Sequence, residues 1–279
     1  MSSTLTLSLA DLAGTDLGEH TATYDDTAVI LYALAVGAAP DDLDLVYERD
    51  LRTLPTYACA LGLWAVEAAG RLGAYDPKRS LHASQRLVVH KPLPPSGSIV
   101  MSGRVANVYD KGKASIVEIE ATSEFFTATY NIFLPGVGGW GGDRGPSSPT
   151  AERPEPTHST EFQTTPNLAV LYRLTGDRHP VHIDPAVADA NGFGRPILHG
   201  LCTLGIAARE IAEQVGAHPA DLRELEVRLS APVLPGQKLR ISSASQEGRV
   251  YFEGTAGETG VLSGGTATFH TTMKGTNNV

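Results

Sequence analysis

Cysteine, basic side chains and uninterrupted apolar stretches are all scarce in this sequence of 279 residues. Its two cysteines, Cys59 and Cys202, lie far apart within apolar stretches, which predicts buried free thiols in a reducing compartment and not a disulfide framework. Lys and Arg total 22 against 31 Asp and Glu, and the formal charge of −9 argues against nucleic acid as a general partner. Gly, Glu or Arg interrupts the longest apolar stretches, so no membrane span is expected.

No targeting signal is recognisable in the sequence. Residues 1–5 (MSSTL) lack the basic region and long apolar stretch of a signal peptide, and residues 276–279 (TNNV) match no targeting tripeptide. The composition, 42% hydrophobic and 19% charged, is typical of a soluble globular protein, and the length suits one large domain or two of medium size. We therefore expect a cytoplasmic protein.

The first half of the sequence predicts a buried helix followed by an antiparallel sheet. Residues 57–70 have apolar or small side chains on nearly every face, as expected of a helix that is buried all round. Alternating apolar positions and intervening turn residues then predict strands at 84–90, 99–109, 114–121 and 127–134. These elements suggest a sheet that wraps around one helix.

The second half repeats this order, which indicates a tandem duplication. An apolar helix is expected at 201–215, before strands at 223–229, 237–246, 249–258 and 261–271. The stretches RLV at 86–88 and EVR at 226–228 each precede a Pro-rich turn and a long strand. A connection rich in Gly, Pro and Ser separates the halves. We therefore predict a first domain at 1–140, a linker at 141–160 and a second domain at 161–279.

One loop in the second half carries both an acid and a base. Asp177 and His182 lie in a stretch that Pro180 and Pro185 keep out of regular helix or strand, because each proline removes a backbone donor and fixes φ. A histidine beside a carboxylate can activate a water molecule. The alternative is an ordinary turn, in which Asp177 caps backbone amides and His182 is solvated.

Gly200 stands at the start of the apolar helix that follows this loop. Backbone N–H groups at a helix start can hold a carbonyl oxygen, as in an oxyanion hole. The alternative reason for a glycine here is close packing of the helix against the sheet. The loop and the helix start together predict acid/base chemistry on a carbonyl compound.

Other kinds of site find less support in the sequence. His179, His182 and Asp184 are close together, but an intervening proline disturbs their common face and nothing completes a set of ligands, so no metal is expected. Cys202 lies within an apolar helix and no G-x-S-x-G motif occurs, which argues against a covalent nucleophile. Trp140, in a glycine cluster, is either a lid over a pocket or a hydrophobic staple for the linker.

Several motifs in this chain resemble those of the peroxisomal-type enoyl-CoA hydratase 2, an (R)-specific family in the MaoC-like dehydratase group. The resemblance rests on LYRLTGD at 171–177 with PVHIDP at 180–185, and on GF at 192–193 with RPILHGLC at 195–202. Further matches are QRL at 85–87, PLP at 92–94, DKGK at 110–113 and GGWGG at 138–142. The resemblance implies an α+β double hot-dog fold, in which two antiparallel sheets each wrap around a long central helix.

The resemblance also implies an activity, the reversible syn addition of water to a trans-2-enoyl-CoA to give a (3R)-3-hydroxyacyl-CoA. Asp177 and His182 would activate the water and transfer its proton to Cα, and the Gly200 amide would hold the thioester oxygen. The predicted substrate-binding residues are His82, Ala83, Lys111, Arg178, His179 and Leu229. The acyl-CoA is itself the substrate, no cofactor is expected, and a homodimer is expected by analogy with other hot-dog folds.

Three positions depart from the family's pattern. His179 stands where the family has Asn in its active site, and we expect it to alter water placement, acyl preference or pH dependence. Ala83 replaces a usual Gly and narrows the approach of the backbone to a ligand. Pro135 stands where the family tends to have Arg, which is expected to weaken contacts with CoA phosphates. Two alternative functions are a non-catalytic hot-dog subunit that binds acyl thioesters, and a dehydratase acting on acyl-carrier-protein thioesters.

Overall fold

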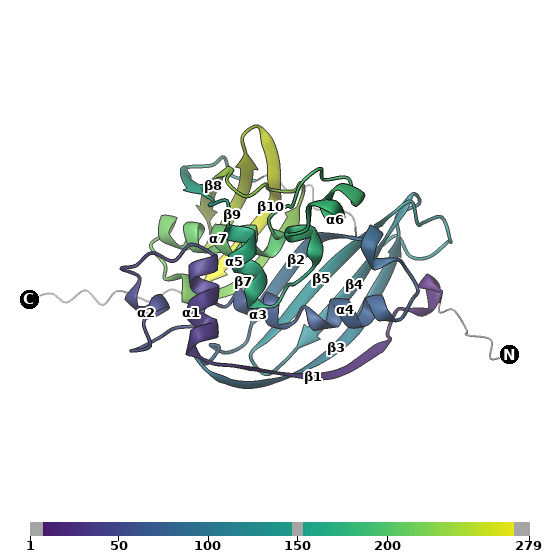
Figure 1. Cartoon of the computed structure of the whole chain (residues 1–279), viewed down its shortest axis with the longest axis horizontal. Coiled ribbons are helices and arrows are strands. Elements are labelled where there is room, and N and C mark those ends of the chain that lie inside the picture. The colour runs from purple at the N-terminus through teal and green to yellow at the C-terminus, as the bar shows by residue number, and fades with distance from the viewer. Residues whose placement is uncertain (1–7, 147–152, 271–279) are drawn as a thin grey trace, which may run out of the picture.

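Ten antiparallel strands form one continuous sheet, with helices packed against it (Figure 1). The computed structural model describes residues 8–146 and 153–270. The strands of the first half are β1 Asp16–Tyr24, β2 Leu81–Val89, β3 Gly97–Asp110, β4 Ala114–Thr122 and β5 Phe126–Pro135. Those of the second half are β6 His158–Gln163, β7 Leu222–Leu229, β8 Lys238–Gln246, β9 Arg249–Ala256 and β10 Thr259–Phe269.

The strand order across the sheet reflects the repeat in the sequence. It runs β1-β3-β4-β5-β2-β7-β10-β9-β8-β6, so each half reads outward in the same way from the central β2–β7 pair. At this joint Ser84 lies opposite Arg228, and Leu87 lies opposite Leu225. The two predicted sheets are therefore joined edge to edge. A palindromic order of this kind is the arrangement that a tandem duplication produces.

The central helix is continuous in the second half and divided in the first. The predicted buried helix of the second half is present as α7 Gly200–Gln214, and every residue from Leu201 to Ala212 is buried. The helix predicted at 57–70 in the first half is instead divided into α3 Tyr57–Leu61 and α4 Trp64–Arg71. In Figure 1, α3 and α4 lie across the strands of the first half.

A contact from the sheet explains the break between α3 and α4. Tyr130 on β5 donates its hydroxyl hydrogen to the carbonyl oxygen of Cys59 at 2.7 Å. In a regular helix that carbonyl would accept from Leu63, whose N–H instead bonds to the carbonyl of Ala60 at 3.3 Å. Gly62 makes room for the tyrosine, since a Cβ atom there would lie 2.6 Å from its hydroxyl oxygen. The break therefore depends on Tyr130, which lies 68 residues after Gly62 and 71 after Cys59. The periodicity of the helix sequence gives no sign of so distant a contact.

The remaining helices are short. They are α1 Asp26–Ala35, α2 Leu43–Val46, α5 Leu168–Tyr172 and α6 Pro185–Ala190. Asp25 begins α1 by accepting the N–H of Ala28 at 3.0 Å. Within residues 8–146 and 153–270, no helix has both the length and the apolar character needed to cross a bilayer.

Two strands, β1 and β6, were not predicted, and both lie at the edges of the sheet. Tyr24 is the single buried residue of β1, and β6 has none. A two-residue period arises where one face of a strand is buried, so these exposed edge strands carry little signal. β6 begins at His158, inside the stretch 141–160 that was predicted as a linker.

Asp110, the last residue of β3, holds the glycine cluster at 138–142 in place. Its carboxylate accepts the backbone N–H groups of Gly139, Gly112 and Gly141, each at 2.8 Å. These hydrogen bonds, of which that from Gly139 has the largest effect, lower the pKa of Asp110 to about 2. One carboxylate thus fastens both the turn after β3 and the segment after β5.

Trp140 attaches the same segment to the sheet. Its indole N–H donates to Oγ of Ser115 at 3.0 Å, and that hydroxyl donates to the carbonyl of Val137 at 2.7 Å. The ring packs against the hydrophobic core and does not line the large cavity described below. Of the two roles considered for Trp140, the structure shows the staple.

Removal of the Asp110 carboxylate should destabilise the fold in a pH-dependent manner. Because the folded-state pKa is about 2, against an ordinary 3.8, the stabilisation is complete above about pH 4 and is lost as the pH falls towards 2. Asp110→Ala should therefore unfold several degrees below the wild type at neutral pH, and the difference should shrink in acid. Thermal unfolding at several pH values measures this. Asp189→Ala, which removes an exposed carboxylate on α6, is the control; a difference that does not change with pH would contradict the role given to the charge.

Candidate active site

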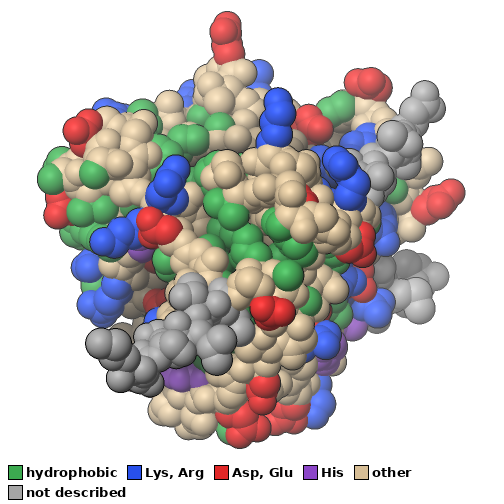
Figure 2. Space-filling view, turned by 90° about the vertical axis from the view of Figure 1, so that its right-hand side faces the viewer, with side chains coloured by type: hydrophobic (Ala, Val, Ile, Leu, Met, Phe, Trp, Pro, Cys, Tyr) green, Lys and Arg blue, Asp and Glu red, His purple; other side chains and the backbone are tan. Residues whose placement is uncertain are grey.

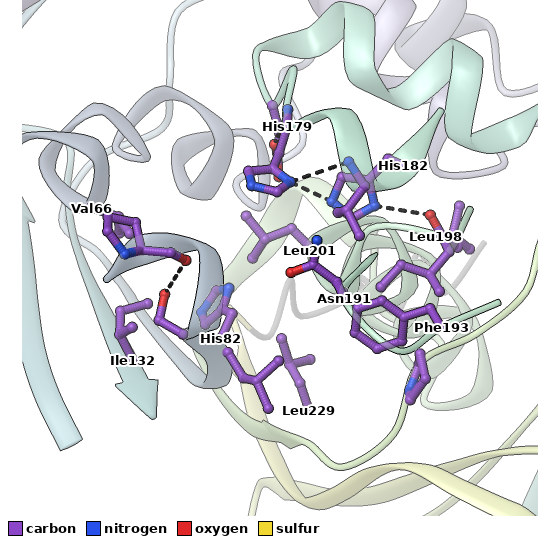
Figure 3. Close-up of a pocket in the computed structure, with 18 of the residues that line it drawn as sticks. Val66, His82, Ile132, His179, His182, Asn191, Phe193, Leu198, Leu201 and Leu229 are labelled. Atoms are coloured by element: carbon purple, nitrogen blue, oxygen red, sulfur yellow. Dashed lines mark hydrogen bonds and ion pairs between the residues drawn. The ribbon is translucent and has the colours of Figure 1, made fainter. Parts of the chain in front are cut away.

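A cavity of about 1010 Å³ lies between the two halves of the chain and is lined by both. The first half contributes residues of α4, of the turn before β2, and of β2 and β5. The second half contributes residues of the acid/base loop, of the segment 190–198 and of the start of α7, together with Leu229 at the end of β7, the turn that follows it, and residues of β10. Figure 3 shows side chains around this space, with His82 of the first half close to Leu229 of the second.

The backbone of the acid/base loop explains the glycine and prolines of its motif. Gly176 has φ of 141°, in the region that favours glycine, and ends η3 Arg173–Thr175. Pro180 opens the short η4 Pro180–His182, where its missing N–H costs no hydrogen bond. Asp184 caps α6 with its carboxylate, so this residue has a structural task. The acid and the base are thus carried on turns that are fixed at both ends.

His182 is a buried histidine whose ring nitrogens face different partners. Nδ1 lies 2.9 Å from the carbonyl oxygen of Ile197, which can only accept, so Nδ1 carries the hydrogen and Nε2 presents a lone pair. Nε2 lies 3.9 Å from Oδ2 of Asp177, too far for a direct hydrogen bond but a distance that one water molecule can bridge. Burial lowers the pKa of His182, and the Asp177 carboxylate only partly offsets this. At neutral pH the ring is therefore an uncharged base.

Gly200 presents the start of α7 to the same cavity. As the first helical residue its N–H has no acceptor within the helix, and the aligned peptide dipoles of α7 place partial positive charge there. A Cβ atom at Gly200 would lie 2.6 Å from Cδ1 of Leu229, so a larger residue would push this cavity-lining leucine aside. Close packing, the second reason proposed for the glycine, therefore holds at this position, while a hydrogen bond from its amide to a carbonyl oxygen stays a prediction.

Four of the six predicted substrate-binding residues line the cavity, namely His82, Arg178, His179 and Leu229. Burial lowers the pKa of His82 to about 4, so this ring is uncharged at neutral pH. His179 is exposed at the edge of the cavity, with its ring centre 6.3 Å from that of His182. His179 therefore lies next to the acid/base pair, as its place in the motif predicts.

The other two, Ala83 and Lys111, are not among the residues that line the cavity. Ala83 occupies an irregular step of β2, where the register with β5 shifts. The ammonium group of Lys111 donates to the carbonyl oxygen of Arg144, beyond the glycine cluster. Contacts of Ala83 and Lys111 with a substrate stay predictions.

Two features of the cavity go beyond the residues predicted from the sequence. The ring of His199 lies behind His182, and it is almost completely buried. Three basic residues of the first half, Arg71, Lys78 and Arg79, line the cavity near its surface. His199 stands directly before Gly200 in the motif, which was an available signal. No pattern distinguished the three basic residues from ordinary solvated charges.

The donor atoms of Asp177, His182 and His199 all lie within 4.8 Å of one another, the sort of cluster that can hold a metal ion. The arrangement of the rings does not suit one. His182 and His199 are stacked at 3.6 Å with an angle of 23° between their planes, so their in-plane lone pairs cannot converge on a single ion. One nitrogen of each ring also faces a backbone carbonyl. This geometry suits proton transfer.

Models of two domain families match the chain. The MFE-2 hydratase 2 N-terminal domain matches residues 22–133, and the MaoC like domain matches residues 148–266. The relative "Enoyl-CoA hydratase 2, peroxisomal" from Arabidopsis thaliana is 35% identical, over 80% of this chain and 82% of the relative. The relative "3-hydroxyacyl-thioester dehydratase Y" from Mycobacterium tuberculosis is 36% identical, over 82% of this chain and 85% of the relative.

Some relatives are much longer than this chain. "Peroxisomal multifunctional enzyme type 2" from Mus musculus is 33% identical over 88% of this chain, yet the match covers only 36% of that protein. The chain thus spans about a third of the length of this multifunctional relative.

Solved structures share the fold. The crystal structure of a MaoC-like dehydratase from Phytophthora capsici matches with a TM-score of 0.83 and 28% identity, over 94% of this chain and 97% of that one. A Mycobacterium tuberculosis protein described as a double hotdog fold matches with a TM-score of 0.55 and 16% identity, over 93% and 96%, which shows the fold alone. The α+β double hot-dog prediction is therefore confirmed, and the chain belongs to the MaoC-like dehydratase family, in its hydratase 2 group.

Proposed function

We propose that this protein is an (R)-specific 2-enoyl-CoA hydratase, which adds water reversibly to a trans-2-enoyl-CoA to give a (3R)-3-hydroxyacyl-CoA. The observation that carries the proposal is the pair of His182 Nε2 and Asp177 Oδ2, 3.9 Å apart, in a cavity that the start of α7 also faces. The names of relatives, an enoyl-CoA hydratase 2 and a 3-hydroxyacyl-thioester dehydratase, support the two directions of one reaction.

The first step uses the gap between the two side chains. A water molecule donates hydrogen bonds to Oδ2 of Asp177 and Nε2 of His182, which leaves an oxygen lone pair directed at C3 of the enoyl thioester. As the C3–O bond forms, one O–H bond of the water breaks and its proton passes to Nε2. The electrons of the C2=C3 double bond move onto the thioester, which becomes an enolate.

Gly200 and the acid/base pair complete the addition. The enolate oxygen accepts a hydrogen bond from the Gly200 amide at the positive end of α7, in a partly buried site where such a bond is strong. C2 then takes a proton from the pair that activated the water, so hydrogen and hydroxyl arrive on the same face. The pair regains its starting state. No cofactor is proposed, because the addition needs neither electron transfer nor a carrier group.

Charges around the cavity support CoA as the carrier. Arg71, Lys78, Arg79 and Arg178 all line it and are exposed, in a chain whose formal charge is −9. Such a local group of basic side chains attracts phosphates. Pro135, which stands where the family tends to have Arg, also lines the cavity, and we expect the basic side chains around it to replace the phosphate contacts of that arginine.

Partners and location follow from the family only by analogy. Figure 2 shows a face on which apolar side chains gather near the centre, with charged side chains of both signs around them. A second copy of the chain that covers apolar surface would give the homodimer we propose. A cytoplasmic location also stays a prediction, and the Arabidopsis thaliana relative is named as peroxisomal.

Loss of either member of the pair should abolish most of the activity. Asp177→Asn and His182→Ala should each lower kcat/KM for enoyl-CoA hydration by roughly 10²- to 10⁴-fold, the usual contribution of a general acid or base. The loss of enoyl-CoA absorbance with time measures the rate, and Asp189→Asn on the exposed side of α6 is the matched control. Full activity in both variants would sink the mechanism. Saturable acyl-CoA binding by the wild type, without turnover at any chain length, would favour the non-catalytic alternative.

Activity should persist to a lower pH than an ordinary histidine allows. Burial lowers the pKa of His182 from 6.5, so Nε2 stays free to accept a proton as the pH falls through that value, and kcat/KM should decline only below it. The neighbouring His179 also lowers the pKa of His182, by electrostatic repulsion of the protonated ring of His182. His179→Asn should therefore shift the acid limb to higher pH. Profiles of kcat/KM against pH for both proteins test this, and a wild-type acid limb at or above 6.5 contradicts it.

The basic side chains should act on the carrier and not on the chemistry. Lys78→Glu combined with Arg79→Glu should raise KM for an enoyl-CoA by roughly tenfold or more, since each reversal replaces attraction of phosphate by repulsion. KM for the matching N-acetylcysteamine thioester, which has no phosphate, should not change. Arg249→Glu, which changes an exposed residue at the start of β9, is the control. A higher kcat/KM on acyl-carrier-protein thioesters than on CoA thioesters contradicts CoA as the carrier.

A further inference from the structure

His199 occupies a place from which it contacts both members of the acid/base pair. It precedes α7, and its ring is only 1% exposed. One face stacks on His182, with ring centres 3.6 Å apart and 23° between the planes. The ring of Tyr172 also packs against it, with ring centres 4.8 Å apart and 47° between the planes. The ring is therefore held without freedom to rotate.

The hydrogen bond of His199 goes to the catalytic acid's backbone. Nε2 lies 3.1 Å from the carbonyl oxygen of Asp177, and because a carbonyl only accepts, Nε2 carries the hydrogen. Nδ1 is buried and has no hydrogen-bond partner among the described residues. A phenylalanine would fill the same space without leaving a buried nitrogen unpaired. The property that a histidine adds here is therefore its Nε2–H.

The ring of His199 takes no proton during turnover. Burial is the largest cause, and the neighbouring His182 the next, of a pKa lowered to about 3. It is uncharged at any pH at which the protein is expected to work, and its Nε2–H is already engaged with Asp177. Its effect on the reaction must therefore come through the position of its neighbours.

A four-residue segment, 197–200, sets the position of every group in the proposed reaction. The carbonyl of Ile197 fixes the tautomer and direction of His182. The ring of His199 holds the backbone of Asp177, and Gly200 supplies the amide at the start of α7. One short segment, which is continuous with the buried α7, thus contacts the acid and the base and contains the amide donor.

We propose that His199 is a positioning residue, which through its Nε2–H holds Asp177 at the distance from His182 that a bridging water requires. The inference rests on the proposed function, because that function needs the water between these two side chains. Displacement of Asp177 by a fraction of an ångström leaves the substrate site intact but misplaces the water. The expected defect therefore lies in kcat and not in KM.

Three substitutions at His199 separate its hydrogen bond from its ring. His199→Gln places an amide nitrogen near the position of Nε2 and keeps the donor. His199→Asn places its nitrogen near Nδ1 instead, and His199→Phe keeps the ring without a donor. We expect kcat within about threefold of the wild type for Gln, and a loss of roughly 10- to 100-fold for Asn and Phe, with KM nearly unchanged in all three.

The control is His90→Phe, which replaces an exposed histidine beyond β2 and should leave kcat and KM unchanged. Thermal unfolding and the Kd for a saturated acyl-CoA, which cannot be hydrated, show whether each variant keeps its fold and its binding site. Wild-type kcat in a folded His199→Phe, or a higher kcat for Phe than for Gln, overturns the proposal. A wild type without turnover on any enoyl thioester instead overturns the proposed function, so the two failures are distinct.

Discussion

The pairing of β2 with β7 is the contact on which the rest of the molecule depends. It joins two five-stranded halves into one sheet, with the buried Leu87 opposite the buried Leu225. The same register brings His82, near the start of β2, beside Leu229 at the end of β7, and both line the cavity. Leu229 in turn lies against Gly200 at the start of α7. A shift of one residue in the pairing of β2 with β7 would turn every side chain of the shifted strand to the opposite face of the sheet. The packing of the core and the lining of the cavity therefore depend on the same register.

The two halves of the chain have the same order of elements, but their central helices differ in structure. In the second half α7 is continuous and buried, and its first residue, Gly200, lines the cavity, so the positive end of the helix dipole lies beside it. In the first half Tyr130 takes the carbonyl of Cys59 and divides the helix, and α4 then follows a separate course along the cavity wall. The acid/base loop belongs to the second half and the basic side chains mostly to the first. The two different forms of the helix thus coincide with the division of tasks that we propose, with acid/base chemistry in the second half and carrier binding mostly in the first.

The sequence predicted the proximity of those site residues that are close to one another in the chain. Asp177 and His182 are five positions apart, and Gly200 opens a helix with an unmistakable apolar pattern, so their convergence could be predicted. The break after α3 could not, because it depends on Tyr130, far along the chain. The edge strands β1 and β6 escaped prediction because exposure removes the alternation that identifies a strand. His199 was visible in the motif, but its role depends on ring stacking and on a hydrogen bond to a backbone carbonyl, neither of which residue type reveals.

Burial shapes the cavity and also sets the proton affinities within it. His82, His182 and His199 all have lowered pKa values, and desolvation is the largest cause in each case. An uncharged His182 is ready to take a proton from water. Its conjugate acid is also a stronger acid than an ordinary imidazolium, so it returns that proton readily to the carbon of an enolate. A solvated histidine would hold the proton more tightly and slow the second step. The reversible hydration that we propose needs both transfers through one pair, and it is desolvation, more than any single contact, that would suit this pair to both.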